Sequence, residues 1–433
     1  MIEQQTVCLR RLGCTRSGEV KLGRWLSNED VTKEEIAENI LEKSKSLVKG
    51  KHILAIQDTT ELNYESKINR IAGIGPVGNG LNHGTYLHTM LAVDANESTC
   101  LGLTSIKTWT RSEIKKKKYG NIYRKQLIED KESYKWIEAA DKSKQILSDA
   151  VKITIVADRE SDIYEEWYRI PDDRTYLITR ACQDRVLCDG NKLFSYAEKL
   201  NVTGFHELEV RAQLGKRTAR KAKLEIRFGI VEIKKPPKCT DNNAPPSVRL
   251  TVVDVKEHKS SALKDEEPIH WCLLTTHSIE TEEDALQIIN WYCQRWQIEQ
   301  FFRTLQKQGL DIESSQVETV EKLMKIITIA CFAALRIMQL TLSRDGNDQN
   351  ISVVFSEQER KLLSRLQIKL EGKTEKQKNP HPQGKLSWAA WIIARLGGWK
   401  GYVSESPPGP ITMLRGFRKF QLIYEGWSLE MCA

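Results

Sequence analysis

The sequence lacks several patterns that would assign it to a familiar class. None of its ten cysteines forms a CxxC pair or lies in a histidine pattern of zinc-finger type. The amino terminus has no apolar stretch like that of a signal peptide, and no internal repeat is present. These absences argue against a zinc-ribbon protein, a secreted protein and a repeat protein. They predict a soluble cytoplasmic protein with reduced thiols.

Long uncharged hydrophobic runs are also missing. The most apolar stretch, residues 323–340, contains Lys325, Arg336 and Gln339, whereas a membrane span needs about 20 nearly uncharged residues. We therefore predict a buried helix here and no membrane contact. The formal net charge of +8 is compatible with a polyanionic partner but does not identify one.

Hydrophobic patterning predicts an α/β protein with a mixed sheet and helices on both faces. Short apolar runs predict buried strands, residues 85–94 and 99–109 predict an antiparallel pair, and residues 281–308 predict one long helix. Between residues 182 and 269 the pattern changes to alternation with period two, which indicates an inserted antiparallel β subdomain. The predicted units are a short helical N-terminal region (1–49), a core (50–181 and 270–310), the insert (182–269) and a helical C-terminal region (311–433).

Two aspartates follow predicted buried strands. Asp58 ends "HILAIQD" and Asp158 ends "KITIVAD". Carboxylates at the carboxyl ends of neighbouring strands would meet at one edge of the sheet, where open α/β sheets place their sites. A third acid from a helix crossing that edge would complete an all-oxygen pocket, which is the ligand set that Mg²⁺ prefers.

The predicted helix 281–308 offers that third acid. At 100° per residue, Tyr292, Arg295, Glu299, Arg303 and Gln306 share a narrow stripe. Glu299 could face the metal while the arginines and the tyrosine face phosphates. Each feature also has an ordinary explanation. Asp58 could be a turn residue, the acids from Asp158 on could begin a helix, and the mixed-charge stripe could be a solvated helix face with i,i+4 charge pairs. The conjunction of all three acids on the expected elements favours a site.

These segments together resemble a known family. "QDTTELNY", "ADRESDIY" and "YCQRWQIEQFFRTLQKQGLDIE" resemble the three catalytic segments of bacterial insertion-sequence DDE transposases. The closest group has a β insertion in a ribonuclease-H-like core, as in the transposase of the composite kanamycin-resistance transposon. The third segment follows the signature Tyr-x2-Arg-x3-Glu-x6-Lys through Tyr292, Arg295 and Glu299, but position 306 is Gln in place of Lys.

The resemblance implies that Asp58, Asp158 and Glu299 bind Mg²⁺, with Mn²⁺ as a substitute, for nicking, hairpin formation and strand transfer. It implies a homodimer that holds transposon-end and target DNA, dimerised through residues 311–433, and a bacterial protein associated with the nucleoid. Trp271 matches the aromatic residue that stacks on a flipped base; its alternative role is that of a core aromatic.

Further basic residues are candidates for DNA contact. Arg303, or Lys307 next to position 306, would replace the missing signature lysine. Lys216, Arg217 and Arg220 in "GKRTARKAK" could neutralise phosphates, or could simply belong to a solvated hairpin loop. Only 57 residues precede Asp58, so one interpretation of residues 1–49 is a truncated DNA-binding domain.

The sequence therefore predicts a DNA transposase that acts by cut-and-paste transposition. Two alternatives remain open. One is a ribonuclease-H-like nuclease without strand transfer, and the other is a catalytically inactive DNA-binding remnant that inhibits an active enzyme.

Overall fold

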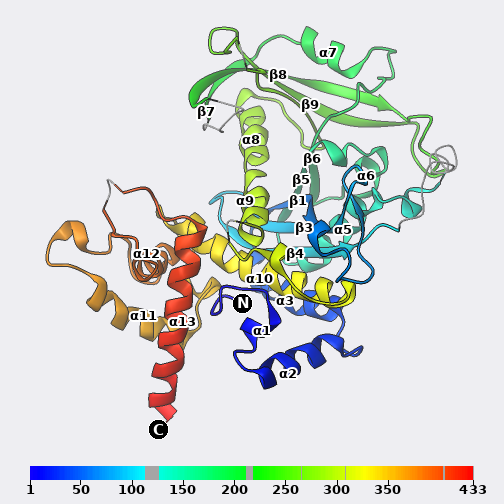
Figure 1. Ribbon diagram of the computed structural model, residues 1–433. Coiled ribbons are helices and arrows are strands. Elements are labelled where there is room, and N and C mark those ends of the chain that lie inside the picture. Colours follow the sequence, from blue (N-terminus) through cyan, green and yellow to red (C-terminus); the bar gives the residue numbers. More distant parts are fainter. Residues whose placement is uncertain (113–125, 211–217, 265, 308, 403–404, 433) are drawn as a thin grey trace.

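One continuous sheet runs through the protein. The computed structural model describes residues 1–112, 126–210, 218–264, 266–307, 309–402 and 405–432 (Figure 1). Its strands follow the order β2-β3-β1-β5-β6-β10-β9-β8-β7, and β4 also pairs with β3. They are β1 (His52–Asn63), β2 (Gly75–Val77), β3 (Asn82–Asp94), β4 (Cys100–Trp109), β5 (Lys152–Ala157), β6 (Thr175–Arg180), β7 (Gly204–Val210), β8 (Arg220–Lys234), β9 (Ser247–Glu257) and β10 (His270–Thr275).

The first half of this sheet has the predicted ribonuclease-H-like arrangement. β1 lies in the centre, antiparallel to β3 on one side and parallel to β5 on the other. β4 pairs antiparallel with β3, and β6 pairs parallel with β5. The predicted antiparallel pair and the mixed sheet are thus confirmed.

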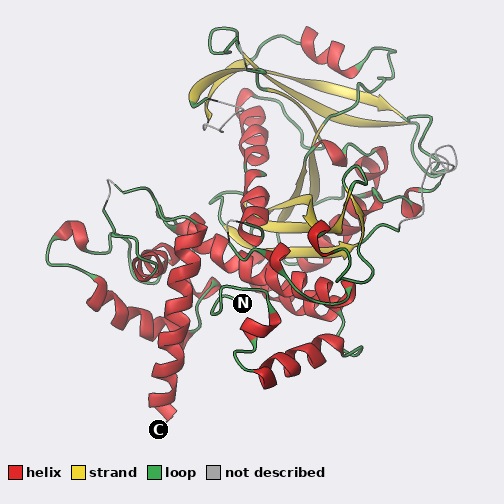
Figure 2. Ribbon diagram, viewed as in Figure 1, coloured by secondary structure: helices red, strands yellow, loops and turns green. Residues whose placement is uncertain are grey.

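The inserted strands are joined to the core sheet. β7, β8 and β9 form an antiparallel meander, and β9 pairs with β10, where Trp271 is opposite Val255. In Figure 2 the long β8–β9 ribbon extends from the top of the molecule, away from the C-terminal helices. Because β10 also pairs with β6, hydrogen bonds connect the insert with the strands that carry the candidate site.

Helices cover both faces of the sheet, as predicted. One apolar core packs the sheet against α8 (Glu282–Cys293), α9 (Trp296–Leu305) and α10 (Val320–Ser343). The other core packs the opposite face against α5 (Tyr134–Ile146), α6 (Tyr164–Arg169) and α7 (Leu193–Lys199). Apolar residues of β1 alternate between the two cores: Leu54 and Ile56 belong to the first, Ile53 and Ala55 to the second.

The apolar stretch 323–340 lies in α10. Of the described helices, α10 is the one long and apolar enough to cross a membrane, but 72% of its most apolar window is buried inside the protein. The prediction of a buried helix is confirmed.

The remaining helices lie at the two ends of the chain. The N-terminal ones are α1 (Leu9–Leu12), α2 (Arg16–Ser27) and α3 (Lys33–Val48). The C-terminal ones are α11 (Glu357–Leu370), α12 (Leu386–Leu396) and α13 (Pro410–Cys432). In Figure 1 α13 projects from the body of the protein.

Candidate active site

The sheet places the two aspartates at the same level on neighbouring strands. In the parallel pair β1–β5, Ile56 is opposite Val156, so Asp58 and Asp158 each stand two residues beyond a paired position. Side chains alternate along a strand, and Ile56 and Val156 both belong to the core that contains α8 and α9. Both carboxylates therefore leave the sheet on the face that α9 covers.

The structure corrects one detail of this prediction. Asp58 does not end its strand, because β1 continues to Asn63 through pairing with β3. What ends near Asp58 is the pairing with β5. Asp158 does follow its strand directly and precedes a single 3-10 turn, Arg159–Ser161. The two strands thus separate at the aspartates, which leaves space for a third element.

That element is not the single long helix that we predicted. The helix is interrupted at Gln294 and Arg295, between α8 and α9, which lie end to end (Figure 1). Here the amides bond three residues back: Arg295 N donates to Tyr292 O (3.0 Å) and Ile298 N to Arg295 O (3.1 Å). A 3-10 turn places side chains i and i+3 above one another. The interruption therefore puts Tyr292 and Arg295 on the same side.

Three carboxylates converge on the guanidinium of Arg295. Its Nη1 lies 3.1 Å from Asp58 Oδ2, and its Nη2 lies 3.5 Å from Asp158 Oδ2 and 2.7 Å from Glu299 Oε1. Groups that contact one guanidinium are necessarily neighbours, so the structure brings together the three acids that the sequence predicts. Arg295, which we expected to face DNA phosphates, lies between them instead.

Burial and charge act in opposite directions at this cluster. Burial raises the pKa of Asp58 to about 6, although Arg295 and the hydrogen bond from Thr59 N lower it. Burial alone would lower the pKa of Arg295, but Asp158, Tyr292, Asp58 and Glu299 raise it above its ordinary value. One buried cation thus faces three acids, and the cluster carries excess negative charge.

Two aromatic residues adjoin the cluster. Tyr292 Oη donates to Asp158 Oδ1 (3.1 Å), and the pKa of Tyr292 is raised by burial and by Asp158. The ring of Trp271 on β10 packs edge-on against Tyr292, with 5.5 Å between centroids. Through this contact with Tyr292, Trp271 lies near the acids. Its side chain is half-buried and therefore partly accessible to solvent.

The donor chemistry of the cluster fits a hard divalent cation, while a guanidinium occupies the position between the donors. Carboxylate oxygens are the ligands that Mg²⁺ and Mn²⁺ prefer, and the excess negative charge favours a cation. Yet no group of three His, Cys, Asp or Glu side chains within the described ranges is placed to hold a metal ion. The carboxylates surround Arg295, which takes the central position.

Comparison with known proteins gives the family. A family model described as the transposase DDE domain matches residues 88–336, which is more than half of the 433 residues. The chain belongs to the transposase DDE domain family. Asp158 and Glu299 lie within the matched residues, and Asp58 lies before them.

Among solved structures, this DDE-family chain is similar to one of a piggyBac transposase synaptic complex with hairpin DNA. The identity is 10% and the TM-score 0.33, with 69% of this chain and 48% of that chain covered. The chain thus spans about half the length of that protein. The ribonuclease-H-like fold of this chain is established by the order and direction of its strands.

Sequence reasoning missed two basic residues beside the acids of this DDE-family site. Arg180 ends β6, where its Nη1 lies 3.9 Å from Asp158 Oδ1. The register, in which Ala157 is opposite Thr179, would have shown this neighbour if the strand-end argument had been applied to β6. Lys135 on α5 lies 3.9 Å from Glu160, in the turn that follows Asp158, and burial lowers its pKa.

A buried polar chain supports the backbone beneath the aspartates. Glu166 on α6 accepts from Gln57 Nε2 (3.0 Å) and hydrogen-bonds to Ser161 Oγ. Gln57 Oε1 faces His88 Nε2 (3.3 Å), and His88 Nδ1 faces Thr59 Oγ1 (2.9 Å). Gln57 and Thr59 flank Asp58, and Ser161 closes the turn after Asp158. Glu166 therefore connects both aspartate segments from the opposite face.

The predicted phosphate ligands on α9 have different surroundings. Arg303 is exposed, with its guanidinium 5.8 Å from the centre of the Trp296 ring. Lys307 is exposed just beyond the end of α9. Gln306, at the signature lysine position, donates from Nε2 to Glu61 O on β1 (3.1 Å). Arg303 and Lys307 are thus available to solvent, whereas Gln306 fastens α9 to the sheet.

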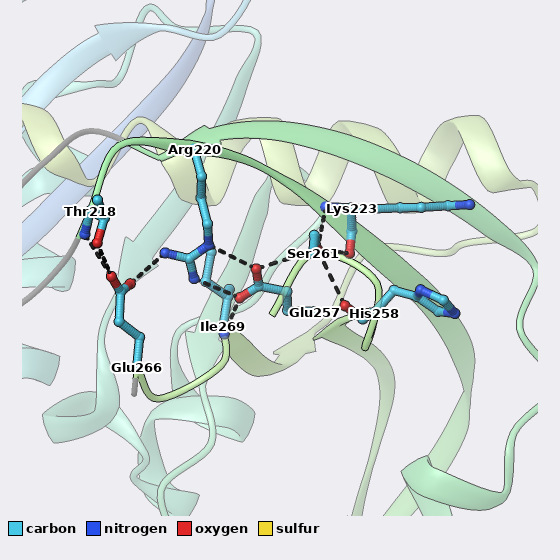
Figure 3. A network of polar contacts seen from close by, with 8 residues as sticks. All are labelled: Thr218, Arg220, Lys223, Glu257, His258, Ser261, Glu266 and Ile269. Carbon is cyan, nitrogen blue, oxygen red and sulfur yellow. Dashed lines mark hydrogen bonds and ion pairs between the residues drawn. The ribbon is translucent and has the colours of Figure 1, made fainter. Parts of the chain in front are cut away.

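The structure gives Arg220 a different role from the predicted DNA contact. Its guanidinium lies between Glu257 (2.9 Å) and Glu266 (2.5 Å), and its side chain is only 9% exposed (Figure 3). It closes the end of the β8–β9 ribbon and has no free face for a phosphate. Lys216 and Arg217 lie outside the described residues.

A cavity lined by several arginines lies between the N-terminal segment and helix α13. Its volume is about 1070 Å³, and it is lined by Arg10, Arg11 and Arg16 near α1 and α2 and by Arg418 of α13. Glu19 is the acid in its lining, and it pairs with Arg16. The sequence does not reveal this cluster, because Arg418 is about 400 residues from the other three arginines along the chain.

Proposed function

We propose that the protein is an insertion-sequence transposase that cuts and joins DNA at element ends by a cut-and-paste pathway. The observation that carries the proposal is the convergence of Asp58, Asp158 and Glu299, in that chain order, on one face of a ribonuclease-H-like sheet. Membership of the transposase DDE domain family supports it.

In this proposal the three carboxylates hold divalent metal ions. When bound, two Mg²⁺ ions would activate the attacking oxygen and stabilise the leaving oxygen of a phosphodiester. The chain itself positions the ligands: Thr59 N holds Asp58 (2.8 Å), and Tyr292 Oη holds Asp158 (3.1 Å). Arg180 and Lys135 add positive charge beside the acids, which would favour a phosphate at this edge.

DNA would approach along the exposed basic residues. Arg303 and Lys307 follow Glu299 in the chain and are exposed, and the arginine-lined cavity offers a second place for the phosphate backbone. Trp271 is proposed to receive a base flipped out during hairpin formation. Its contact with Tyr292 supports this role, because an aromatic ring there would lie near a phosphate bound at the acids.

A homodimer is the proposed assembly, formed through the C-terminal helical region. The projecting helix α13 exposes large apolar side chains, with Leu422 47%, Ile423 38% and Leu429 73% exposed. Exposed apolar residues grouped on one helix are typical of an interface.

The proposal is tested by nicking and strand transfer on DNA carrying the element ends, with Mg²⁺ or Mn²⁺. Asp58→Asn, Asp158→Asn and Glu299→Gln are each expected to abolish nicking while keeping end binding in a band shift. Glu129→Gln, an exposed acid of the ion pair with Arg169, serves as the matched control and should nick normally.

The outcomes separate the alternatives. Nicking without joining of ends would indicate a nuclease. End binding without nicking by the wild-type protein would indicate an inactive remnant, which the glutamine at position 306 favours. Nicking that survives all three acid substitutions would refute the assignment of the site.

A further inference from the structure

The position of Arg295 carries an inference about how the metal enters. The guanidinium touches Asp58 Oδ2, Asp158 Oδ2 and Glu299 Oε1 at 3.1, 3.5 and 2.7 Å. These oxygens are the donors that a metal at the centre of the cluster would use. A divalent ion and a guanidinium repel each other at such distances in a partly buried site, so a metal at the centre of the cluster would compete with Arg295 for these oxygens.

We propose that Arg295 is a positioning residue that holds the three carboxylates together in the metal-free protein and competes with the divalent cation for them. Metal then binds as the guanidinium leaves the centre. The inference rests on the proposed metal-binding role of these acids. It accounts for the finding that the donors are gathered and yet, among the described side chains, form no metal-holding group.

The remaining contacts of the acids support this exchange. Asp58 keeps the hydrogen bond from Thr59 N, and Asp158 keeps the one from Tyr292 Oη, when Arg295 departs. Within the part of the chain that the structure describes, Glu299 has no such second anchor; its Oε1 accepts a hydrogen bond from Arg295 Nη2. Loss of Arg295 therefore leaves two acids in place and frees the third to turn onto the metal.

The backbone at Arg295 is suited to such a movement. Arg295 stands at the junction of α8 and α9, outside the regular hydrogen-bond ladder of either helix. A 3-10 interruption within a helical segment often marks a functional hinge. The flanking helices are held by buried residues, Ile289 on α8 and Ile298 and Phe301 on α9, so change at the junction need not move them.

The test measures metal affinity and thermal stability of the full-length protein without DNA. Mn²⁺ binding is measured by isothermal titration, and Tm is measured in EDTA and in Mn²⁺. Arg295→Gln is expected to bind Mn²⁺ at least about tenfold more tightly than the wild type. Its Tm should fall in EDTA, because three acids then face one another, and Mn²⁺ should restore it.

Two further variants complete the design. Arg169→Gln is the matched control, because Arg169 is partly buried and pairs with Glu129 and Asp241 away from the cluster; its Tm should fall without recovery in Mn²⁺. Arg295→Lys keeps the charge but has one nitrogen, so it should show an intermediate gain in affinity. If Arg295→Gln does not fold, the comparison of wild type with Arg295→Lys decides.

Asp158→Asn separates this inference from the proposed function. Loss of Mn²⁺ binding in Asp158→Asn, together with equal or weaker binding in both Arg295 variants, overturns the competition and leaves the metal site standing. Unchanged Mn²⁺ binding in Asp158→Asn, or no binding in any variant, overturns the proposed function as well.

Discussion

Replacing Glu166 with Gln tests how the aspartate segments are held. Glu166 is fully buried on α6, and in the described structure its carboxyl bonds to Gln57 and Ser161, with no cation as a partner. Burial raises its pKa to about 8, against the two hydrogen bonds that lower it. At neutral pH the group is therefore mostly a neutral acid. A glutamine has the same shape, with an oxygen for Gln57 Nε2 and an N–H for Ser161 Oγ.

The sign of the pH effect follows from the raised pKa. Between about pH 4.5 and 8 the folded protein retains a proton on Glu166 that the unfolded chain has lost. Stability conferred by this group is thus greatest at low pH and is lost as pH rises through that window. From pH 5 to pH 7 the loss is about 2 to 3 kcal/mol in the free energy of unfolding.

Glu166→Gln removes this dependence, since glutamine does not titrate. We expect the stability of the variant relative to wild type to rise by about 2 to 3 kcal/mol between pH 5 and pH 7, measured by urea unfolding at each pH. His88, whose pKa burial lowers, and Asp162, which is paired with Arg185, are present in both proteins and cancel in the difference. If the free energies of unfolding of the two proteins changed in parallel with pH, the conclusion that Glu166 is a buried neutral acid would be refuted.

Three further predictions concern other parts of the chain. Arg220→Ala should lower the free energy of unfolding by about 3–5 kcal/mol, because it leaves Glu257 buried without its cationic partner. Urea unfolding measures this change, and an unchanged unfolding curve would indicate that Arg220 behaves as a surface residue. Replacing Arg10 and Arg418 together with Ala should weaken DNA binding and lower the slope of log affinity against log salt by about 2, seen by fluorescence anisotropy; an equal slope would exclude the cavity as a phosphate site. Leu422→Glu on α13 should give monomers in light scattering, whereas a persisting dimer would place the interface elsewhere.

The sequence predicted those features that depend on local pattern. Strands β1, β5, β6 and β10 are continuous apolar runs because both of their faces are buried. The aspartates could be placed because side-chain alternation and parallel pairing are regular. The extension of β1 to Asn63 was missed because it depends on pairing with β3, which sequence alone does not set in register.

Features that depend on distant partners could not be predicted. The interruption at Gln294 and Arg295 contains neither glycine nor proline, so no helix-breaking residue marks it. It coincides with the contacts of Arg295 to Asp58 and Asp158, which lie more than 130 residues away. The two acids that pair with Arg220, Glu257 and Glu266, likewise lie far from it in the sequence. A charge count along the chain does not reveal such pairing.

The site thus combines two fixed acids with one adjustable acid. Asp58 and Asp158 are set by the register of neighbouring strands, and Glu166 holds both segments from the opposite face. Glu299 instead stands one turn after the junction of α8 and α9, while Gln306 fastens the far end of α9 to β1. In the proposed exchange the rearrangement would therefore be confined to the junction of α8 and α9, since the sheet below and the helix end beyond are both anchored. If the proposal holds, two fixed acids with one adjustable acid would allow the cluster to accept a cation without disturbing the core.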